Sequence, residues 1–153
     1  LIVFIWVACS TSPQKGYEIE KDSRGNSIAV GIIGEKDLLQ KFPKFETSYD
    51  AYSPDSAAVS FLKEFQKPVQ VVVVLGTWCP DSQREVGHFL RAWDQAKNNA
   101  ISLKMIAVNR SKDAKGGIRK KYAIERVPTF IVYYGNKEIG RIIEHPKTTV
   151  EGD

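Results

Sequence analysis

The sequence VQVVVVLGTWCPDS, residues 69–82, leads from a run of β-branched residues to a single cysteine. A nearly unbroken valine run is typical of a strand that is buried on both faces of a sheet. Cys79 is followed by Pro80, and proline suits the first position of a helix because its missing N–H group costs nothing there. The pattern predicts a buried strand, a short turn and a helix that begins beside the cysteine.

The residues downstream of Cys79 predict an α/β domain. The helix is expected to run to about residue 97, because its apolar residues recur at spacings of three and four (Val86, Phe89, Leu90, Trp93 and Ala96). Residues 101–108 are predicted to form a second central strand, and residues 114–122 a basic, glycine-broken helix. Residues 127–143 read as two strands joined by a Gly-Asn turn. The order predicts a parallel crossover unit followed by a hairpin.

Upstream of residue 69 the signals are weaker. Residues 17–20 and 27–33 are predicted to form two short strands around the turn sequence DSRGN. A short helix is expected over residues 35–42, closed by Pro43, and an irregular segment is expected to follow it, FETSYDAYSPDS. A further helix is predicted to start at residues 53–55 and to stop before Pro68.

Length and charge limit the class of protein. A chain of 153 residues with 42% hydrophobic residues is sufficient for one domain with its own core. The net charge of +4 is mildly basic. The lysines and arginines between Arg110 and Arg126 have no interleaved aromatic residues, which favours a solvated helix face over a nucleic-acid patch. We therefore expect no nucleic-acid partner.

Residues 1–9, LIVFIWVAC, resemble an export signal. The run is too short to span a bilayer, which takes about 20 residues, but it fits the end of a secretory signal's apolar core. Val7-Ala8-Cys9 resembles a bacterial lipobox, in which the cysteine becomes lipid-modified, although Trp6 replaces the usual leucine. The alternative is an ordinary signal or anchor with an incidental Cys9. The expectation is a bacterial cell-envelope protein facing the periplasm, with a lipid anchor as its one membrane contact, a tether over residues 10–16 and a domain over residues 17–153.

Cys79 is the first candidate for chemistry. At a helix N-cap it would face unpaired backbone N–H groups and the positive end of the helix dipole, which both stabilise a thiolate. A thiolate is the nucleophile that attacks disulfides. The alternative, an inert cysteine that fills space, is disfavoured because Trp78, Pro80, Asp81 and Ser82 are poor material for an apolar pocket. The Asp81 carboxylate suits a helix N-terminus but opposes a neighbouring thiolate.

Residues 69–82, together with the sequence RVPTF at residues 126–130, resemble a thioredoxin-like domain with its core at about residues 69–144. More narrowly, the residues around Cys79 are similar to thioredoxin-like lipoproteins of bacterial envelopes. The resemblance implies a three-layer α/β/α fold with a mixed central sheet and a cis-proline loop at Pro128. It implies that Cys79 is the attacking cysteine and that Val127 offers its backbone to an extended partner segment. Trp78 and Pro80 would complete the partner contacts, with Trp78 shielding the thiol.

Three residues depart from the family pattern. Ser82 stands in place of a resolving cysteine, Val73 in place of a buried acid, and Gly87 in place of a helix-kinking proline. The Ser82 hydroxyl is expected to donate a hydrogen bond to the Cys79 thiolate, but it cannot attack sulfur. A mixed disulfide on Cys79 would therefore persist until another thiol arrives.

The leading interpretation is a monothiol thiol–disulfide exchange protein, with Cys79 and Ser82 as its catalytic residues and protein or small-molecule thiols and disulfides as its partners. The alternative is a non-catalytic binding or redox-sensing module. No cofactor or metal is expected: His88 falls on the exposed side of its helix, His145 lies beyond the last strand, and an iron–sulfur cluster is disfavoured in an exported protein. Gly116-Gly117 does not match a phosphate loop. The number of subunits is left open.

Overall fold

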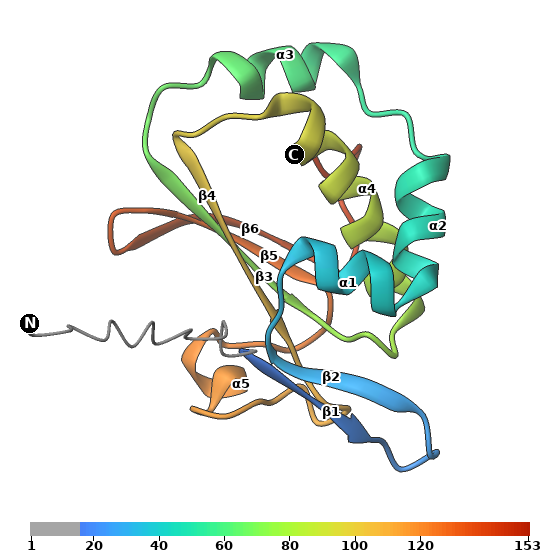
Figure 1. Cartoon of the computed structure of the whole chain (residues 1–153). Helices are drawn as coiled ribbons and strands as arrows, with labels where there is room; N and C mark the ends of the chain where they lie inside the picture. The colour runs from blue at the N-terminus through green and yellow to red at the C-terminus, as the bar shows by residue number, and fades with distance from the viewer. Residues whose placement is uncertain (1–15) are drawn as a thin grey trace, which may run out of the picture.

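The computed structural model of the protein describes residues 16–153 (Figure 1). The predicted signal remnant with Cys9, and the tether up to residue 15, lie outside the described residues. Within residues 16–153, none of the helices is both long and apolar enough to span a membrane.

A six-stranded mixed sheet forms the centre of the fold, in the order β1-β2-β4-β3-β5-β6. The valine run forms β3 (Val69–Leu75), which pairs in parallel with β4 (Ile101–Ala107) and antiparallel with β5 (Thr129–Tyr134). The outer strands are antiparallel: β1 (Tyr17–Lys21) pairs with β2 (Ser27–Ile32), β2 with β4, and β5 with β6 (Lys137–Ile143). The crossover unit and both hairpins predicted from the sequence are confirmed.

Helices cover both faces of the sheet, so the three-layer α/β/α prediction is confirmed (Figure 1). One face packs against the longer helices, namely α1 (Glu35–Lys41), α2 (Pro43–Ala51), α3 (Ser56–Glu64) and α4 (Pro80–Ala96). The other face packs against α5 (Ile118–Lys121) and its flanking loops. Val71 and Val73 of β3 point to the first layer, and Val72 and Val74 point to the second. This alternation buries β3 on both sides, as the valine run predicts.

The prediction of an irregular segment after Pro43 is wrong, because residues 43–51 form α2. Pro43 closes α1 and also stands in the first turn of α2, where proline is favourable. α2 lies along α4 (Figure 1) and buries Phe45 completely. A Cβ atom at Gly87 of α4 would stand 2.7 Å from Ser48 Cβ and 2.9 Å from the Phe45 carbonyl oxygen. The glycine therefore permits the close approach of the two helices.

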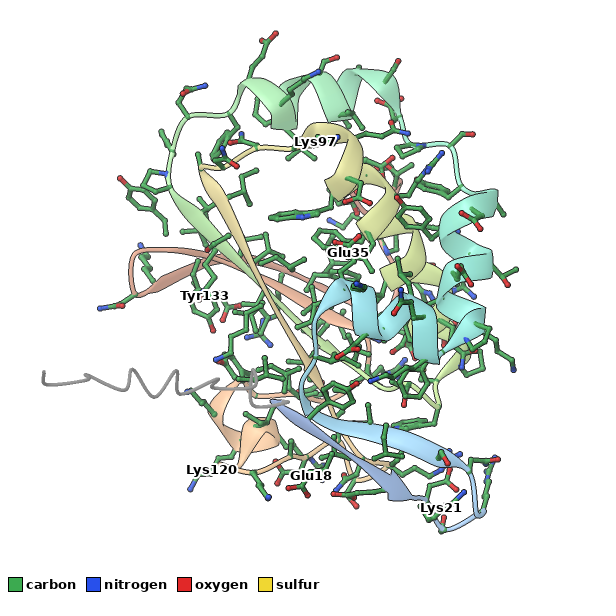
Figure 2. All side chains as sticks on the ribbon, in the orientation of Figure 1. Glu18, Lys21, Glu35, Lys97, Lys120 and Tyr133 are labelled. Atoms are coloured by element: carbon green, nitrogen blue, oxygen red, sulfur yellow. The ribbon has the colours of Figure 1, made fainter. Side chains whose placement is uncertain are left out.

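The helix predicted over residues 114–122 is much shorter in the structure. Only Ile118–Lys121 are helical, because Gly116 and Gly117 adopt positive φ angles of 91° and 65°. Such angles are readily available to glycine and end a right-handed helix. Three of the four residues of α5 are basic. The helix lies on the second face of the sheet, near the β1–β2 hairpin; Figure 2 labels Lys120 of α5 and Glu18 of β1.

Candidate functional site

Cys79 occupies the N-cap of α4, directly after the turn that follows β3. Its N–H group donates to the Gly76 carbonyl at 3.0 Å, and its own carbonyl accepts from the Gln83 N–H at 3.0 Å. Pro80 stands in the first turn of α4 and is exposed. The position is that expected from the sequence, a cysteine held between a buried strand and the N-terminus of a long helix. However, the Cys79 side chain makes no cap hydrogen bond to the helix N–H groups.

The Cys79 thiol lies against the loop with Val127 and Pro128, which is the predicted docking loop. The peptide bond between Val127 and Pro128 is cis, which confirms that prediction. Cys79 Sγ donates a hydrogen bond to the Val127 carbonyl oxygen at 3.3 Å, and only 8% of the cysteine is exposed. The Val127 N–H group has no hydrogen-bond partner among residues 16–153. The fold thus brings together a thiol and a free backbone donor that are 48 residues apart.

Ser82 does not face the thiol. Its hydroxyl oxygen accepts a hydrogen bond from the Gly76 N–H at 3.1 Å, and the residue is fully buried. No hydrogen bond between Ser82 and Cys79 is formed within the described chain, so the expected contact to sulfur is not present. Ser82 instead fixes the turn before Cys79. Val73 is also fully buried and packs in the core beneath α4.

Trp78 is held from three directions. Its indole Nε1–H donates to the Val108 carbonyl at 2.9 Å. The Arg110 guanidinium lies 5.0 Å from the ring centroid, within cation–π range. The ring also covers Gly76, where a Cβ atom would stand 2.7 Å from it. The side chain is half-buried beside Cys79 and packs with the same apolar cluster.

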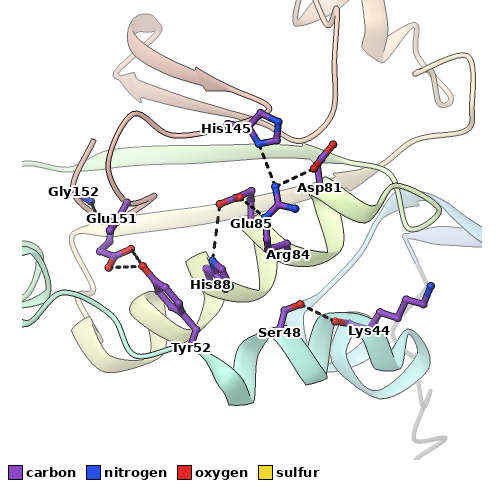
Figure 3. Close-up of polar contacts among 11 residues, drawn as sticks. Lys44, Ser48, Tyr52, Asp81, Arg84, Glu85, His88, His145, Glu151 and Gly152 are labelled. Atoms are coloured by element: carbon purple, nitrogen blue, oxygen red, sulfur yellow. Dashed lines mark hydrogen bonds and ion pairs between the residues drawn. The ribbon is translucent and has the colours of Figure 1, made fainter.

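A charged network that was not predicted from the sequence surrounds Arg84 (Figure 3). Arg84 donates to Asp81 at 2.9 Å and to Glu85 at 2.8 Å, and it contacts His145 Nδ1 at 3.2 Å. The i,i+3 spacing of Asp81 and Arg84 could have indicated their pairing. The contact to His145 spans 61 residues and has no local signal.

The same network contains a possible set of metal ligands. Asp81, Glu144 and His145 each place one ligand atom within 4.8 Å of the others. However, Asp81 is paired with Arg84 at 2.9 Å, and Glu144 is paired with Arg126 at 2.6 Å. Because both carboxylates already have cationic partners, this arrangement is poorly suited to a metal ion, and we assign none.

His88 is not on an exposed helix face, contrary to the sequence-based prediction. Its ring stacks on Tyr52 with 4.0 Å between the centroids, and it is half-buried because α2 covers that side of α4 (Figure 3). Burial lowers the pKa of His88 below its usual value. Burial and the hydrogen bond to Glu151 raise the pKa of Tyr52 to about 12. These groups tie α2 and the segment after β6 to α4.

A hollow of about 450 Å³ lies between α3, α4 and the sheet. Its lining is mainly apolar and aromatic and includes Phe61, Phe89, Trp93 and Phe130. None of the residues around the thiol lines it. The hollow therefore does not belong to the candidate site.

Comparison with known proteins agrees with this geometry. A family model described as thioredoxin matches residues 36–151, a range that includes both Cys79 and Pro128. No curated protein matches the sequence. A protein of unknown function from Pseudomonas aeruginosa has a similar structure, with 21% identity, a TM-score of 0.53 and coverage of 78% of this chain and 70% of that chain. An HIV epitope-scaffold is similar at 22% identity and a TM-score of 0.52, covering 74% of this chain and 67% of that one. These two likenesses concern the fold alone.

Proposed function

Since this chain belongs to the thioredoxin family, we propose that it is a monothiol thiol–disulfide exchange protein whose reacting group is Cys79. The observation that carries the proposal is the contact of 3.3 Å between Cys79 Sγ and the carbonyl of Val127, next to the cis-proline. A thiol placed against a loop with a free backbone N–H group can meet a disulfide in an extended partner segment.

Each exchange step consumes one thiol and one disulfide and produces one new thiol and one new disulfide. Cys79 loses its proton to solvent, and the thiolate attacks one sulfur of a partner disulfide. A new bond forms between Cys79 and that sulfur, the old disulfide bond breaks, and the second sulfur leaves as a thiolate that takes up a proton. A further thiol then attacks the mixed disulfide, releases Cys79 and forms the new disulfide. No electrons are gained or lost by the protein over the cycle.

Docking would use the free N–H group of Val127. An extended segment that accepted this hydrogen bond would add a short stretch of strand beside the loop. Trp78 and the exposed Pro80 are the chain neighbours of the cysteine and offer apolar contact. The site therefore favours a disulfide carried on an extended chain over one held in a rigid helix.

The step that ends the cycle must come from outside the chain. Ser82 is buried and has its oxygen engaged by Gly76, and Val73 supplies no acid near the sulfur. The mixed disulfide is thus expected to be long-lived, which suits disulfide shuffling, thiol capping or client trapping better than net reduction.

The test is to follow adduct formation on the full chain with Cys9 replaced by serine, which leaves Cys79 as the only thiol. The reduced protein is incubated with oxidised glutathione, quenched in acid and measured by intact mass spectrometry. The proposal expects one glutathione adduct that persists in the absence of added thiol. The additional substitution Ser82→Cys should abolish the persistent adduct and produce an intramolecular disulfide in its place.

Cys79→Ala is the matched control and also tests the alternative function. It should lose the adduct and all exchange activity. If the wild-type chain forms no adduct while partners recovered from cells bind Cys79→Ala and wild type equally, the exchange proposal fails and a non-catalytic binding module replaces it.

We also propose that the protein works in the bacterial cell envelope, facing the periplasm and anchored by lipid on Cys9. The support is the apolar run of residues 1–8 followed by the lipobox-like Val7-Ala8-Cys9. Labelling of cells with a radioactive fatty acid should mark the wild-type protein and not the Cys9→Ser variant. Labelling of both proteins, or of neither, would contradict the anchor.

A further inference from the structure

We propose that Asp22, in the turn between β1 and β2, is a positioning residue for the thiol loop, defined as residues 76–79, and that it acts through Arg110 and Trp78. The proposal rests on the proposed function only in treating Cys79 as the reacting group. It assigns a role to the β1–β2 hairpin, which precedes the family match and contributes no residue to the exchange chemistry itself.

The carboxylate of Asp22 joins the hairpin turn to Arg110. One oxygen, Oδ1, accepts from the backbone N–H groups of Arg24 at 2.9 Å and Asn26 at 2.8 Å. The other, Oδ2, accepts from Arg110 Nε at 2.7 Å and Nη2 at 2.6 Å. The Asp22 side chain is 1% exposed and that of Arg110 is 28% exposed. Arg110 is thus held by two of its donors on one well-covered oxygen, which fixes the plane of the guanidinium.

The charge of Asp22 is secure at ordinary pH. Removal of the carboxylate from water raises its pKa, but the hydrogen bonds from Asn26, Arg110 and Arg24 outweigh this and lower the pKa to about 2. The anion needed to hold Arg110 is therefore present throughout the range in which thiols exchange.

Arg110 transmits this position to Trp78. The guanidinium covers the indole ring at 5.0 Å from its centroid, while the indole N–H is anchored on the Val108 carbonyl. The ring also covers Gly76, the first residue of the thiol loop. The Cys79 N–H group donates a hydrogen bond to the Gly76 carbonyl. A shift of the Trp78 ring would therefore displace both ends of the thiol loop, Gly76 and Cys79.

The hairpin reaches the thiol loop at a second point. The backbone N–H of Ala29, in β2, donates to the hydroxyl oxygen of Thr77 at 3.1 Å, and Thr77 is buried. The Thr77 carbonyl accepts from the Gln83 side chain at 2.9 Å, which connects the same residue to α4. Because these two hydrogen bonds hold Thr77 independently of Arg110, only the position of the Trp78 side chain is expected to depend on Arg110.

Loss of the Asp22–Arg110 pair should loosen Trp78 and uncover the thiol. Asn at position 22 can still accept the turn hydrogen bonds, but its amide nitrogen cannot accept from arginine. A cation–π contact at a partly exposed site corresponds to about a two- to fivefold change in an equilibrium. We therefore expect Asp22→Asn to raise the rate of Cys79 alkylation by iodoacetamide about two- to fivefold.

The experiment measures this rate at several pH values in the full chain with Cys9 replaced by serine. The matched control is Glu18→Gln, which removes one charge from the same hairpin but breaks only the exposed pair with Lys115 at 2.6 Å. The control should react at the wild-type rate. Arg110→Gln should react as fast as Asp22→Asn, and the double variant should react no faster than either single variant.

A spectroscopic measurement follows Trp78 directly. In protein labelled with 5-fluorotryptophan, the fluorine resonance that Trp78→Phe removes should shift in Asp22→Asn and stay in place in Glu18→Gln. Equal alkylation rates in Asp22→Asn and Glu18→Gln, or additive effects of Asp22→Asn and Arg110→Gln, would overturn the proposal. A chain that forms no glutathione adduct but shows these couplings would refute the exchange function and leave the positioning role standing.

Discussion

Replacing Gly87 with alanine is expected to destabilise the protein, although alanine is the better helix former. In a helix interior the exchange of glycine for alanine contributes about 0.5–1 kcal/mol in favour of the folded state. Overpacking a closely packed contact costs about 1–3 kcal/mol. The two ranges leave a net loss of about 0–2.5 kcal/mol in the free energy of unfolding, and because the new contacts include backbone atoms we expect about 1–2 kcal/mol for Gly87→Ala.

The sign of this prediction depends on what the new methyl group would meet. It would stand 2.7 Å from Ser48 Cβ, 2.9 Å from the Phe45 carbonyl oxygen and 3.0 Å from the Tyr49 backbone nitrogen. Two of these three atoms belong to the backbone of α2, which cannot turn away as the end of a flexible side chain can. The methyl group is therefore accommodated only if α2 moves away from α4, which loosens the packing of buried Phe45.

Urea denaturation followed by circular dichroism measures the loss, and a domain of this size should also melt about 2–8 °C lower. Ser48→Gly is the partner substitution, because it removes the nearest atom that the new methyl group meets. The double variant Gly87→Ala/Ser48→Gly should be more stable than the sum of the two single effects predicts. Gly87→Ala with wild-type or higher stability would refute the argument that Gly87 permits the close approach of α2, whereas strict additivity with Ser48→Gly would place the clash on the α2 backbone alone.

Three further outcomes test other parts of the structure. Glu35 is labelled in Figure 2. Burial, together with the charge and hydrogen bond of Asp94, raises the pKa of Glu35 from 4.5 to about 7. Glu35 therefore contributes stability that is present below pH 4.5 and is lost as the pH rises through 7. The urea midpoint of the wild type should fall between pH 5 and pH 8 by more than that of Glu35→Gln, and equal falls would contradict this. Thr77→Val leaves the buried N–H of Ala29 without its acceptor and should cost about 1–3 kcal/mol, whereas a neutral effect would mean that water replaces the hydroxyl. Leu90→Ala empties a fully buried position on α4 and should lower the free energy of unfolding by about 2–5 kcal/mol by the same denaturation assay; a loss below 1 kcal/mol would mean that the core collapses around it.

Much of the central fold could be predicted because its signals are local. Within β3 the four consecutive valines, residues 71–74, leave no polar position for solvent, so burial on both faces follows directly. Cys79 followed by Pro80 marks a helix N-terminus within two residues. The two hairpins carry their turn residues directly between their paired strands. In each case the structure-forming residues are neighbours in the sequence.

Two of the errors, at α2 and His88, fall where the deciding contacts are distant, and the third, at α5, has a local cause. The sequence FETSYDA lacks a clear apolar stripe, and it forms α2 because Gly87, about forty residues later, leaves room for it against α4. α5 is shorter than its basic pattern suggested because two glycines take positive φ angles. His88 is half-buried by the same α2 that the pattern did not predict.

The candidate site divides in the same way. The sequence was sufficient to predict Cys79 at the start of a helix and Pro128 as a cis-proline beside it, because each lies in a short, characteristic motif. The direction of the Ser82 hydroxyl, the charged network around Arg84 and the Asp22–Arg110–Trp78 contacts came only from the folded chain. The Arg84–His145 contact joins residues that are 61 positions apart, and the Asp22–Arg110 pair joins residues that are 88 positions apart. Such contacts depend on how strands and helices are placed in space, which local sequence patterns do not determine.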